Sequence, residues 1–331
     1  MKKIITLVLS VALVMSLFTA CGKSEKVKTG LAVIPTYSEK SKDAGEEDGL
    51  AQVDQTAVAV LVDSKGVIRN IAIDVMQTKI NFNAAGEITT DLAKEFDSKQ
   101  VLKEAYGMKA ASGIGKEWYE QAQALADYVK GKTLAEVKGI ALDGGYPTGE
   151  DLTSSVTMNI AEIISAIEKA VNNAQDLGAS ADDKLGLGIV SGLGKSKNAS
   201  AEGDGLAQAY THYGVVTLDK DGKITSSILD ASQGNVNFSV EGKITSDLTA
   251  AIETKNELGE RYGMKGASAI GKEWNEQARA FADYITGKKL ADVKGIALDG
   301  GKATSSDLTS SVTVTISEFI HVVELAANSA K

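Results

Sequence analysis

The chain has 331 residues, of which 43% are hydrophobic and 24% charged, a composition typical of globular proteins rather than disordered ones. Its formal net charge of −9 argues against a nucleic-acid partner, because binding to phosphates requires a basic surface. A single cysteine excludes an internal disulfide, and with only two histidines it also argues against a thiolate or histidine-rich metal site.

The N-terminal residues have the pattern of a bacterial secretory signal. Two lysines precede an apolar run over residues 4–20, which ends at the only cysteine, Cys21. This stretch resembles the signal of bacterial lipoproteins, which implies removal of residues 1–20, lipidation of Cys21 and anchoring at the extracytoplasmic face of the cell membrane. Residues 21–29 are then expected to form a short flexible tether. The alternatives are a plain signal peptide or an uncleaved anchor.

The remainder of the chain is an internal repeat. Residues 106–157 and 262–313 are identical at 39 of 52 aligned positions, without a gap. The copies extend over residues 30–174 and 186–331, joined by a polar linker at residues 175–185. A repeat of this length is a whole domain rather than a solenoid unit, and each copy is long enough to bury a core of its own.

Each copy is predicted to form strands first and helices later. In the first copy, the predicted strands are residues 31–34, 56–63 and 67–75, followed by a pair at 80–82 and 86–88. The predicted helices run from Thr90 or Asp91 to Tyr106 and over residues 116–129, 134–137 and 159–172. Because strands and helices do not alternate, we predict an α+β fold of two tandem homologous domains, each an antiparallel sheet with packed helices.

Two motifs that suggest a ligand are better explained by local structure. Residues 266–272 spell most of a phosphate-binding P-loop, but Glu273 occupies the place of the required Ser or Thr, so we expect a loop that leads into a helix. Residues 219–222 lack the downstream ligands of a calcium loop and are expected to form a hairpin turn. Trp118 and Trp274 could stack on a flat ligand, although core packing is the commoner role.

A hydroxyl-rich segment before the last helix of each copy is the strongest candidate site. It comprises residues 151–159 in the first copy and 307–315 in the second. Hydroxyls at a helix N-terminus can bind an anion such as phosphate. The alternative is an elaborate N-cap, in which the same hydroxyls satisfy backbone donors.

This segment resembles the flavin-attachment motif of the bacterial FMN-binding domain family, Asp-x-x-Ser/Thr-Gly-Ala-Ser/Thr. In that family, a flavin transferase links FMN to the last hydroxyl through a phosphodiester bond. The resemblance implies these motif positions: Asp151, Ser154 and Thr157, and Asp307, Ser310 and Thr313. The sequence departs from the family at Gly-Ala, which is Ser-Val at residues 155–156 and 311–312.

These features lead to two hypotheses of different classes. The first is a lipid-anchored electron carrier with FMN on both domains, served by a flavin transferase and redox partners, with no catalytic side chain or metal of its own. The alternative is a non-catalytic surface or structural lipoprotein that has kept the fold and lost the flavin. A hydrolase using Ser154 or Ser310 is disfavoured, because neither copy has an equivalent histidine to serve as base.

Overall fold

The computed structural model describes residues 25–331, so the predicted signal sequence and Cys21 lie outside the described part of the chain. The same elements occur twice at a constant offset, as when β1 begins at residue 28 and β6 at 184, a difference of 156. The first half contains β1 (Lys28–Tyr37), β2 (Gly49–Val62), β3 (Ile68–Phe82), α1 (Lys99–Leu102), η1 (Lys103–Tyr106), α2 (Trp118–Val129), α3 (Leu134–Lys138), β4 (Leu142–Asp143), β5 (Tyr146–Pro147), α4 (Glu150–Thr153) and α5 (Ala161–Asn172). The second half contains β6 (Lys184–Gly192), β7 (Gly205–Leu218), β8 (Ile224–Phe238), α6 (Lys255–Leu258), η2 (Gly259–Tyr262), α7 (Trp274–Ile285), α8 (Leu290–Lys294), β9 (Leu298–Asp299), β10 (Lys302–Ala303), α9 (Ser306–Thr309) and α10 (Ser317–Ser329).

Each half is built on a three-stranded antiparallel sheet, in the order β1-β2-β3 and β6-β7-β8. In the first sheet, Ala59 of β2 lies between Leu31 of β1 and Ala72 of β3. The predicted α+β class is therefore confirmed, with antiparallel sheets packed against helices in two similar halves.

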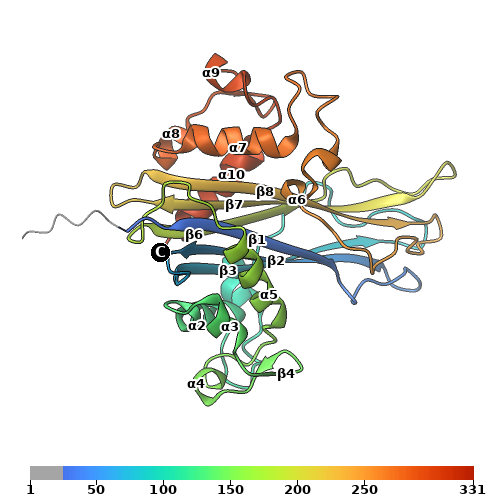
Figure 1. The fold of residues 1–331 in the computed structure, drawn as a ribbon. Helices are drawn as coiled ribbons and strands as arrows, with labels where there is room; N and C mark the ends of the chain where they lie inside the picture. The colour runs from blue at the N-terminus through green and yellow to red at the C-terminus, as the bar shows by residue number, and fades with distance from the viewer. Residues whose placement is uncertain (1–24) are drawn as a thin grey trace, which may run out of the picture.

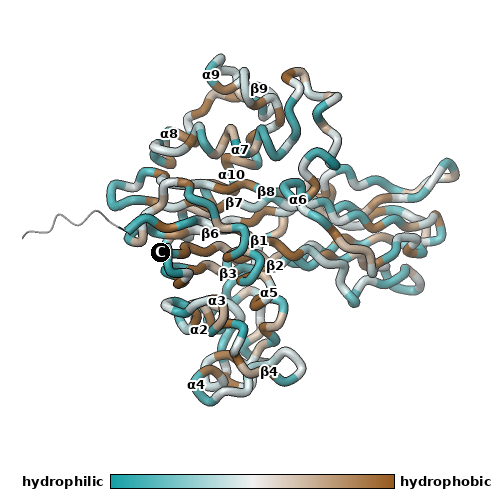
Figure 2. Tube along the Cα trace, viewed as in Figure 1, coloured by the Kyte–Doolittle hydropathy of each residue, from teal (hydrophilic) through white to brown (hydrophobic). Residues whose placement is uncertain are grey.

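The two sheets lie face to face in the middle of the molecule, and the helices cover their outer faces (Figure 1). In the first half, α5 packs on β1 and β2 while α2 packs on β3. In the second half, α10 packs on β6 and β7 while α7 packs on β8. Figure 2 shows hydrophobic segments along the central strands and hydrophilic ones at the outer loops. The result is a four-layer arrangement of helices, sheet, sheet and helices.

The apolar side chains form three clusters. One lies between sheet and helices in each half, so each copy does bury a core of its own. The third lies between the two sheets and contains residues of both halves. In this shared core, at the ends of β3 and β8, the rings of Phe82 and Phe238 stack with centroids 4.4 Å apart, and both side chains are fully buried. The two copies therefore share a core that neither could complete alone.

The segment between β3 and α2 differs from the prediction. No helix starts at Thr90 or Asp91; instead Ser98 caps the short α1. The physical reason lies in the other half, because Phe96 is buried and its backbone N–H donates to the carbonyl of Ser191 in β6 at 2.9 Å. This pairing holds the chain extended where the sequence pattern suggested a helix.

The tether and linker boundaries also differ from the prediction. Lys26 forms a β-bridge with Ser180, and β1 begins at Lys28. Thr29, placed in the tether by the sequence, is fully buried, and its N–H donates to the carbonyl of Gln175 at 2.9 Å. The end of the expected tether and the expected linker thus pair with each other, because both carry apolar residues that enter the shared core.

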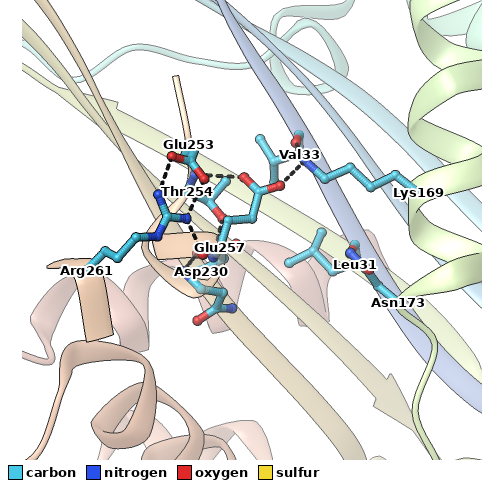
Figure 3. A network of polar contacts seen from close by, with 10 residues as sticks. Leu31, Val33, Lys169, Asn173, Asp230, Glu253, Thr254, Glu257 and Arg261 are labelled. Carbon is cyan, nitrogen blue, oxygen red and sulfur yellow. Dashed lines mark hydrogen bonds and ion pairs between the residues drawn. The ribbon is translucent and has the colours of Figure 1, made fainter. Parts of the chain in front are cut away.

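A polar network joins the halves beside one edge of the sheets (Figure 3). The ammonium of Lys169, on α5, lies 2.5 Å from a carboxylate oxygen of Glu257, on α6, and donates to the carbonyl of Val33 at 2.7 Å. Arg261 lies on the other side of this group, paired with Glu253 at 2.6 Å. The first half thereby fixes the position of α6, a short helix of the second half.

Candidate functional site

Most of the predicted hydroxyl segment lies before the N-terminus of the last helix, and only its end reaches that terminus. Ser154 is the residue after α4, a helix of four residues, whereas α5 starts at Ala161. The backbone N–H of Ala161 is satisfied by the side chain of Asn159 at 3.0 Å. The second copy has the same layout, with Ser310 directly after α9. Of the two interpretations of this segment, the N-cap is seen for Asn159, whereas the serines do not reach the N-terminus of α5 because the end of α4 and a turn separate them from it.

The remaining motif residues are held in different ways. Asp151 lies in the first turn of α4 and accepts a hydrogen bond from the hydroxyl of Tyr128 at 2.8 Å. Val156 and Val312, at the departures from the family motif, are 0% and 1% exposed. The valine therefore serves as a core residue that anchors the segment, which explains why both copies have a large apolar side chain here.

A buried glutamine holds each candidate threonine. In the second half, the side-chain oxygen of Gln277 accepts from the backbone N–H of Thr313 at 2.8 Å and from its hydroxyl at 3.2 Å. The amide nitrogen of Gln277 donates to the hydroxyl of Ser268 at 3.2 Å and to the carbonyl of Lys272 at 3.1 Å. Gln121 bonds Thr157 in the same way in the first half, at 2.8 and 3.3 Å. The glutamine thus fastens the threonine segment to the glycine-containing loop before the tryptophan helix.

Sequence reasoning missed both glutamines, although a signal was present. Gln121 and Gln277 lie one turn after the buried Trp118 and Trp274, on the apolar face of α2 and α7. A polar residue in such a stripe indicates a buried hydrogen-bonding role. The P-loop-like residues 266–272 form turns before the tryptophan helix, as predicted, with Gly271 in a positive-φ conformation.

Thr313 lines a cavity of about 640 Å³ in the second half. Most of its wall comes from β6, β7 and the segments around α6, α7 and α10, and Glu95 of the first half also contributes. The polar and aromatic wall residues that bear on ligand binding are Tyr210, His212, Lys255, Tyr262, Trp274 and Thr313. Trp274 is only 3% exposed, so it both packs in the core and borders the cavity.

Lys255 is the most unusual group in this wall. Its ammonium lies 4.4, 4.6 and 4.9 Å from the ring centroids of Tyr210, Tyr262 and Trp274. It also donates to the hydroxyl of Tyr210 at 2.5 Å. The side chain is buried, and burial lowers the pKa of Lys255 to about 7, an effect that the negative charge of Asp230 opposes. The three ring faces favour the charged form.

His212 is buried beside this group and does not carry a charge near neutral pH. Burial, followed by the positive charge of Lys255, lowers the pKa of His212 to about 3. Its ring lies 4.4 Å from the ring of Tyr210. Among residues 25–331, no group of three or more His, Cys, Asp or Glu side chains has the geometry to hold a metal ion.

The equivalent place in the first half has different chemistry. Lys99 lies over the rings of Tyr106 and Trp118, at 4.6 and 5.2 Å. Asp54 and Thr56 occupy the positions of Tyr210 and His212, and the hydroxyl of Thr56 donates to Glu162. Burial lowers the pKa of Lys99 to about 8, and Asp54 is the strongest of the charges that oppose this. The two halves therefore share the threonine, glutamine and lysine but not the surrounding charges.

Comparison with known proteins gives one distant relative. The chlorophenol reductase of Desulfitobacterium hafniense is 29% identical over 126 residues, which cover 35% of this chain and 38% of the reductase. No protein-family model and no solved structure matches the chain. In the described part of the chain, no helix has both the length and the hydropathy needed to cross a bilayer.

Proposed function

We propose that the chain is a membrane-anchored, extracytoplasmic lipoprotein that carries FMN and transfers electrons. The observation that supports this best is the position of Thr313. The residue that corresponds to the flavin acceptor of the FMN-binding domain family lies in the wall of a cavity of about 640 Å³. Its partner position, Thr157, has the same hydrogen bonds to a buried glutamine.

The wall of the cavity fits a flavin in size and chemistry. Cofactor sites typically measure roughly 300–1,000 Å³, with mostly apolar and aromatic walls and a few placed polar groups. Tyr262, Trp274 and Met264 offer surfaces for a flat ring system, and Lys255 offers a positive charge. Thr313 would carry the phosphate, and Gln277 would keep its segment in place. When bound, FMN supplies one- and two-electron transfer, while the protein provides attachment and orientation.

The test is the intact mass of the protein after coexpression with a flavin transferase. We expect a gain of about 438 Da for one flavin or about 876 Da for two, from FMN less water at each acceptor. Thr313→Ala should remove one increment, and where two are present Thr157→Ala should remove the other. The same spectrum shows whether residues 1–20 are absent and Cys21 is modified. A folded, colourless protein of unchanged mass would exclude covalent attachment.

A second candidate is a surface lipoprotein that has lost the flavin. It is favoured by the hydroxyl of Thr313, which already donates to Gln277, and by the buried Val312 where the family has alanine. Adding free FMN to the colourless protein separates the two candidates. Saturable binding that Thr313→Ala weakens supports the flavoprotein, and no binding supports the non-catalytic role.

A further inference from the structure

The buried ammonium of Lys255 has no carboxylate partner. Within residues 25–331, its hydrogen-bond partner is the neutral hydroxyl of Tyr210, and no carboxylate oxygen lies within the 4.0 Å of an ion pair. Glu95 and Glu318 also line the cavity, but neither reaches this distance. Glu318 instead accepts from the hydroxyl of Ser317 at 2.8 Å.

A buried cation without a counter-ion is costly. Removing an ammonium from water costs several kcal/mol, and a structure compensates with an opposite charge or with hydrogen bonds. The three aromatic rings around Lys255 offset part of this cost, since their faces are negative. They do not neutralise the charge, so the group remains able to bind an anion.

The cation borders the cavity and is only 3% exposed. It lies at the start of α6, where Thr254 caps the helix and Glu257 closes the capping box. Glu257 is in turn paired with Lys169 of the other half at 2.5 Å (Figure 3). Contacts from both halves therefore hold the helix that carries Lys255. The ammonium group is already in position before a ligand binds.

The first half provides an internal comparison. Lys99 occupies the equivalent position but is only partly buried, and the carboxylate of Asp54 replaces the hydroxyl of Tyr210. Asp54, Asp74 and Glu162 all act on Lys99 as negative charges, whereas Lys255 has such an interaction with Asp230, the counterpart of Asp74. A negative ligand near Lys99 would therefore meet more opposing charge than one near Lys255.

We propose that Lys255 is the counter-ion for a planar aromatic anion in the second-half cavity, and that the first half lacks an equivalent anion site. This inference rests on the proposed flavin site, since it assigns a role within the same cavity. The negative charge has two possible sources in a flavin, the phosphate of FMN or the reduced ring. In both cases Lys255 is a binding residue that selects for charge.

The test is a fluorescence titration that reads only the second half. In the Trp118→Phe protein, Trp274 is the sole tryptophan and borders the cavity. The probes are oxidised FMN, oxidised riboflavin and photoreduced riboflavin. A preference for FMN over riboflavin identifies the phosphate as the anion, and tighter binding of riboflavin on reduction identifies the ring.

Lys255→Met should weaken binding of the preferred anionic probe at least tenfold and leave oxidised riboflavin within about twofold. That loss matches the roughly 1.5–3 kcal/mol of a hydrogen bond to a charged group. Lys255→Arg should retain the preference, and the matched variant Lys99→Met should leave every titration unchanged. Circular dichroism establishes that each variant is folded.

Two outcomes overturn the inference, and they are distinguishable. If the parent protein binds flavins but Lys255→Met does so equally well, or Lys99→Met loses as much affinity, Lys255 is not the counter-ion and the proposed function stands. If no probe quenches Trp274 in a saturable way, the flavin site itself is absent and both proposals fail.

Discussion

At the scale of single residues, the most informative feature is a buried carboxyl group repeated in both halves. Asp74 accepts from the backbone N–H groups of Val75 and Gln100, at 2.7 and 3.1 Å. Asp230 does the same for Ala231 and Asn256, at 2.8 and 3.0 Å. These bonds attach β3 and β8 to the short helices that carry Lys99 and Lys255. Both carboxyls are buried, which raises the pKa of each to about 7.

A carboxyl with a raised pKa makes stability depend on pH in a defined direction. Between its unfolded pKa of 3.8 and about 7, the native state binds more protons than the unfolded state. The contribution of Asp230 to the free energy of unfolding therefore falls as pH rises through this range and is constant above it. The lowered pKa of His212 makes the free energy of unfolding rise with pH between about 3 and 6.5, which opposes the effect of Asp230. The contribution of Asp230 is therefore measured as the difference in unfolding free energy between a variant and the parent protein.

The Asp230→Asn protein should therefore become more stable relative to the parent protein as pH increases. The amide oxygen can still accept both backbone hydrogen bonds, while the charge is removed. Between pH 5 and 8, the difference in unfolding free energy should change by about 2–3 kcal/mol in favour of the variant. Urea unfolding at the two pH values measures this, and Asp74→Asn should behave in the same way. Parallel pH profiles for variant and parent would contradict the buried ionisation.

At the scale of elements, the sequence patterns within one copy predicted the helices well. The pairings between the copies could not be predicted from them. The helix predicted at residues 116–129 is observed as Trp118–Val129, and the one predicted at 159–172 as Ala161–Asn172. Their apolar stripes are local and periodic, so the sequence alone suffices. The strands were predicted too short, since β3 runs to Phe82. Its far end is stabilised by the other sheet, a contact that periodicity within one copy does not contain.

The candidate site likewise combines residues that a local sequence pattern predicts with contacts that only the fold creates. Thr157 and Thr313 could be identified from a motif, and the cavity beside Thr313 was not predictable. Its wall combines residues as distant in sequence as Glu95, Tyr210 and Glu318. The aromatic enclosure of Lys255 depends on β7, η2 and α7 meeting at one point. Such a convergence follows from the packing of elements and leaves no contiguous sequence pattern.

The packing of the last helix on the sheet depends on glycine in both halves. A β-carbon at Gly186 would lie 1.8 Å from the carbonyl oxygen of Ala326 on α10. A β-carbon at Gly30 would lie 2.1 Å from that of Ala170 on α5. Neither distance is possible for real atoms, and both obstacles are backbone. The helix therefore rests directly on the strand at this point of the repeat.

Gly186→Ala should destabilise the protein, because α10 or β6 must shift to admit the methyl group. We expect a loss of about 1–3 kcal/mol in the free energy of unfolding, as is usual for overpacking a core. Gly192→Ala is the matched control on the same strand, since a β-carbon there meets nothing within 4 Å. That control should be neutral or slightly stabilising. Equal effects of the two substitutions would contradict the close approach.

At the scale of the whole molecule, the two copies form one structure rather than two independent domains joined by a linker. The core between the sheets takes side chains from both, and polar contacts cross it as well. The hydroxyls of Thr78 and Ser191 are 2.7 Å apart, and those of Thr29 and Ser226 are 2.8 Å apart. The two edges where the sheets meet are not identical, however. The Lys169–Glu257 pair of one edge is replaced at the other by Leu325 and Val101, at the equivalent positions.

A shared core predicts that the halves unfold together. Phe82→Ala removes half of the stacked pair in the shared core and should cost about 3–5 kcal/mol, as for other buried aromatic residues. The loss should appear equally in both halves, although Phe82 belongs to the first. Trp118 reports on the first half in a Trp274→Phe background, and Trp274 reports on the second in a Trp118→Phe background.

The measurement is the denaturant midpoint of each tryptophan, with and without Phe82→Ala. We expect the two midpoints to coincide in the parent and to decrease by the same amount in the variant, since unfolding of either half exposes the inner face of the other. Phe281→Ala, which removes a fully buried ring from the core between α7 and its own sheet, is the control for damage inside one half. It should also move both midpoints. If Phe82→Ala lowers only the midpoint of Trp118, the halves are separate folding units and the central core contributes little to their stability.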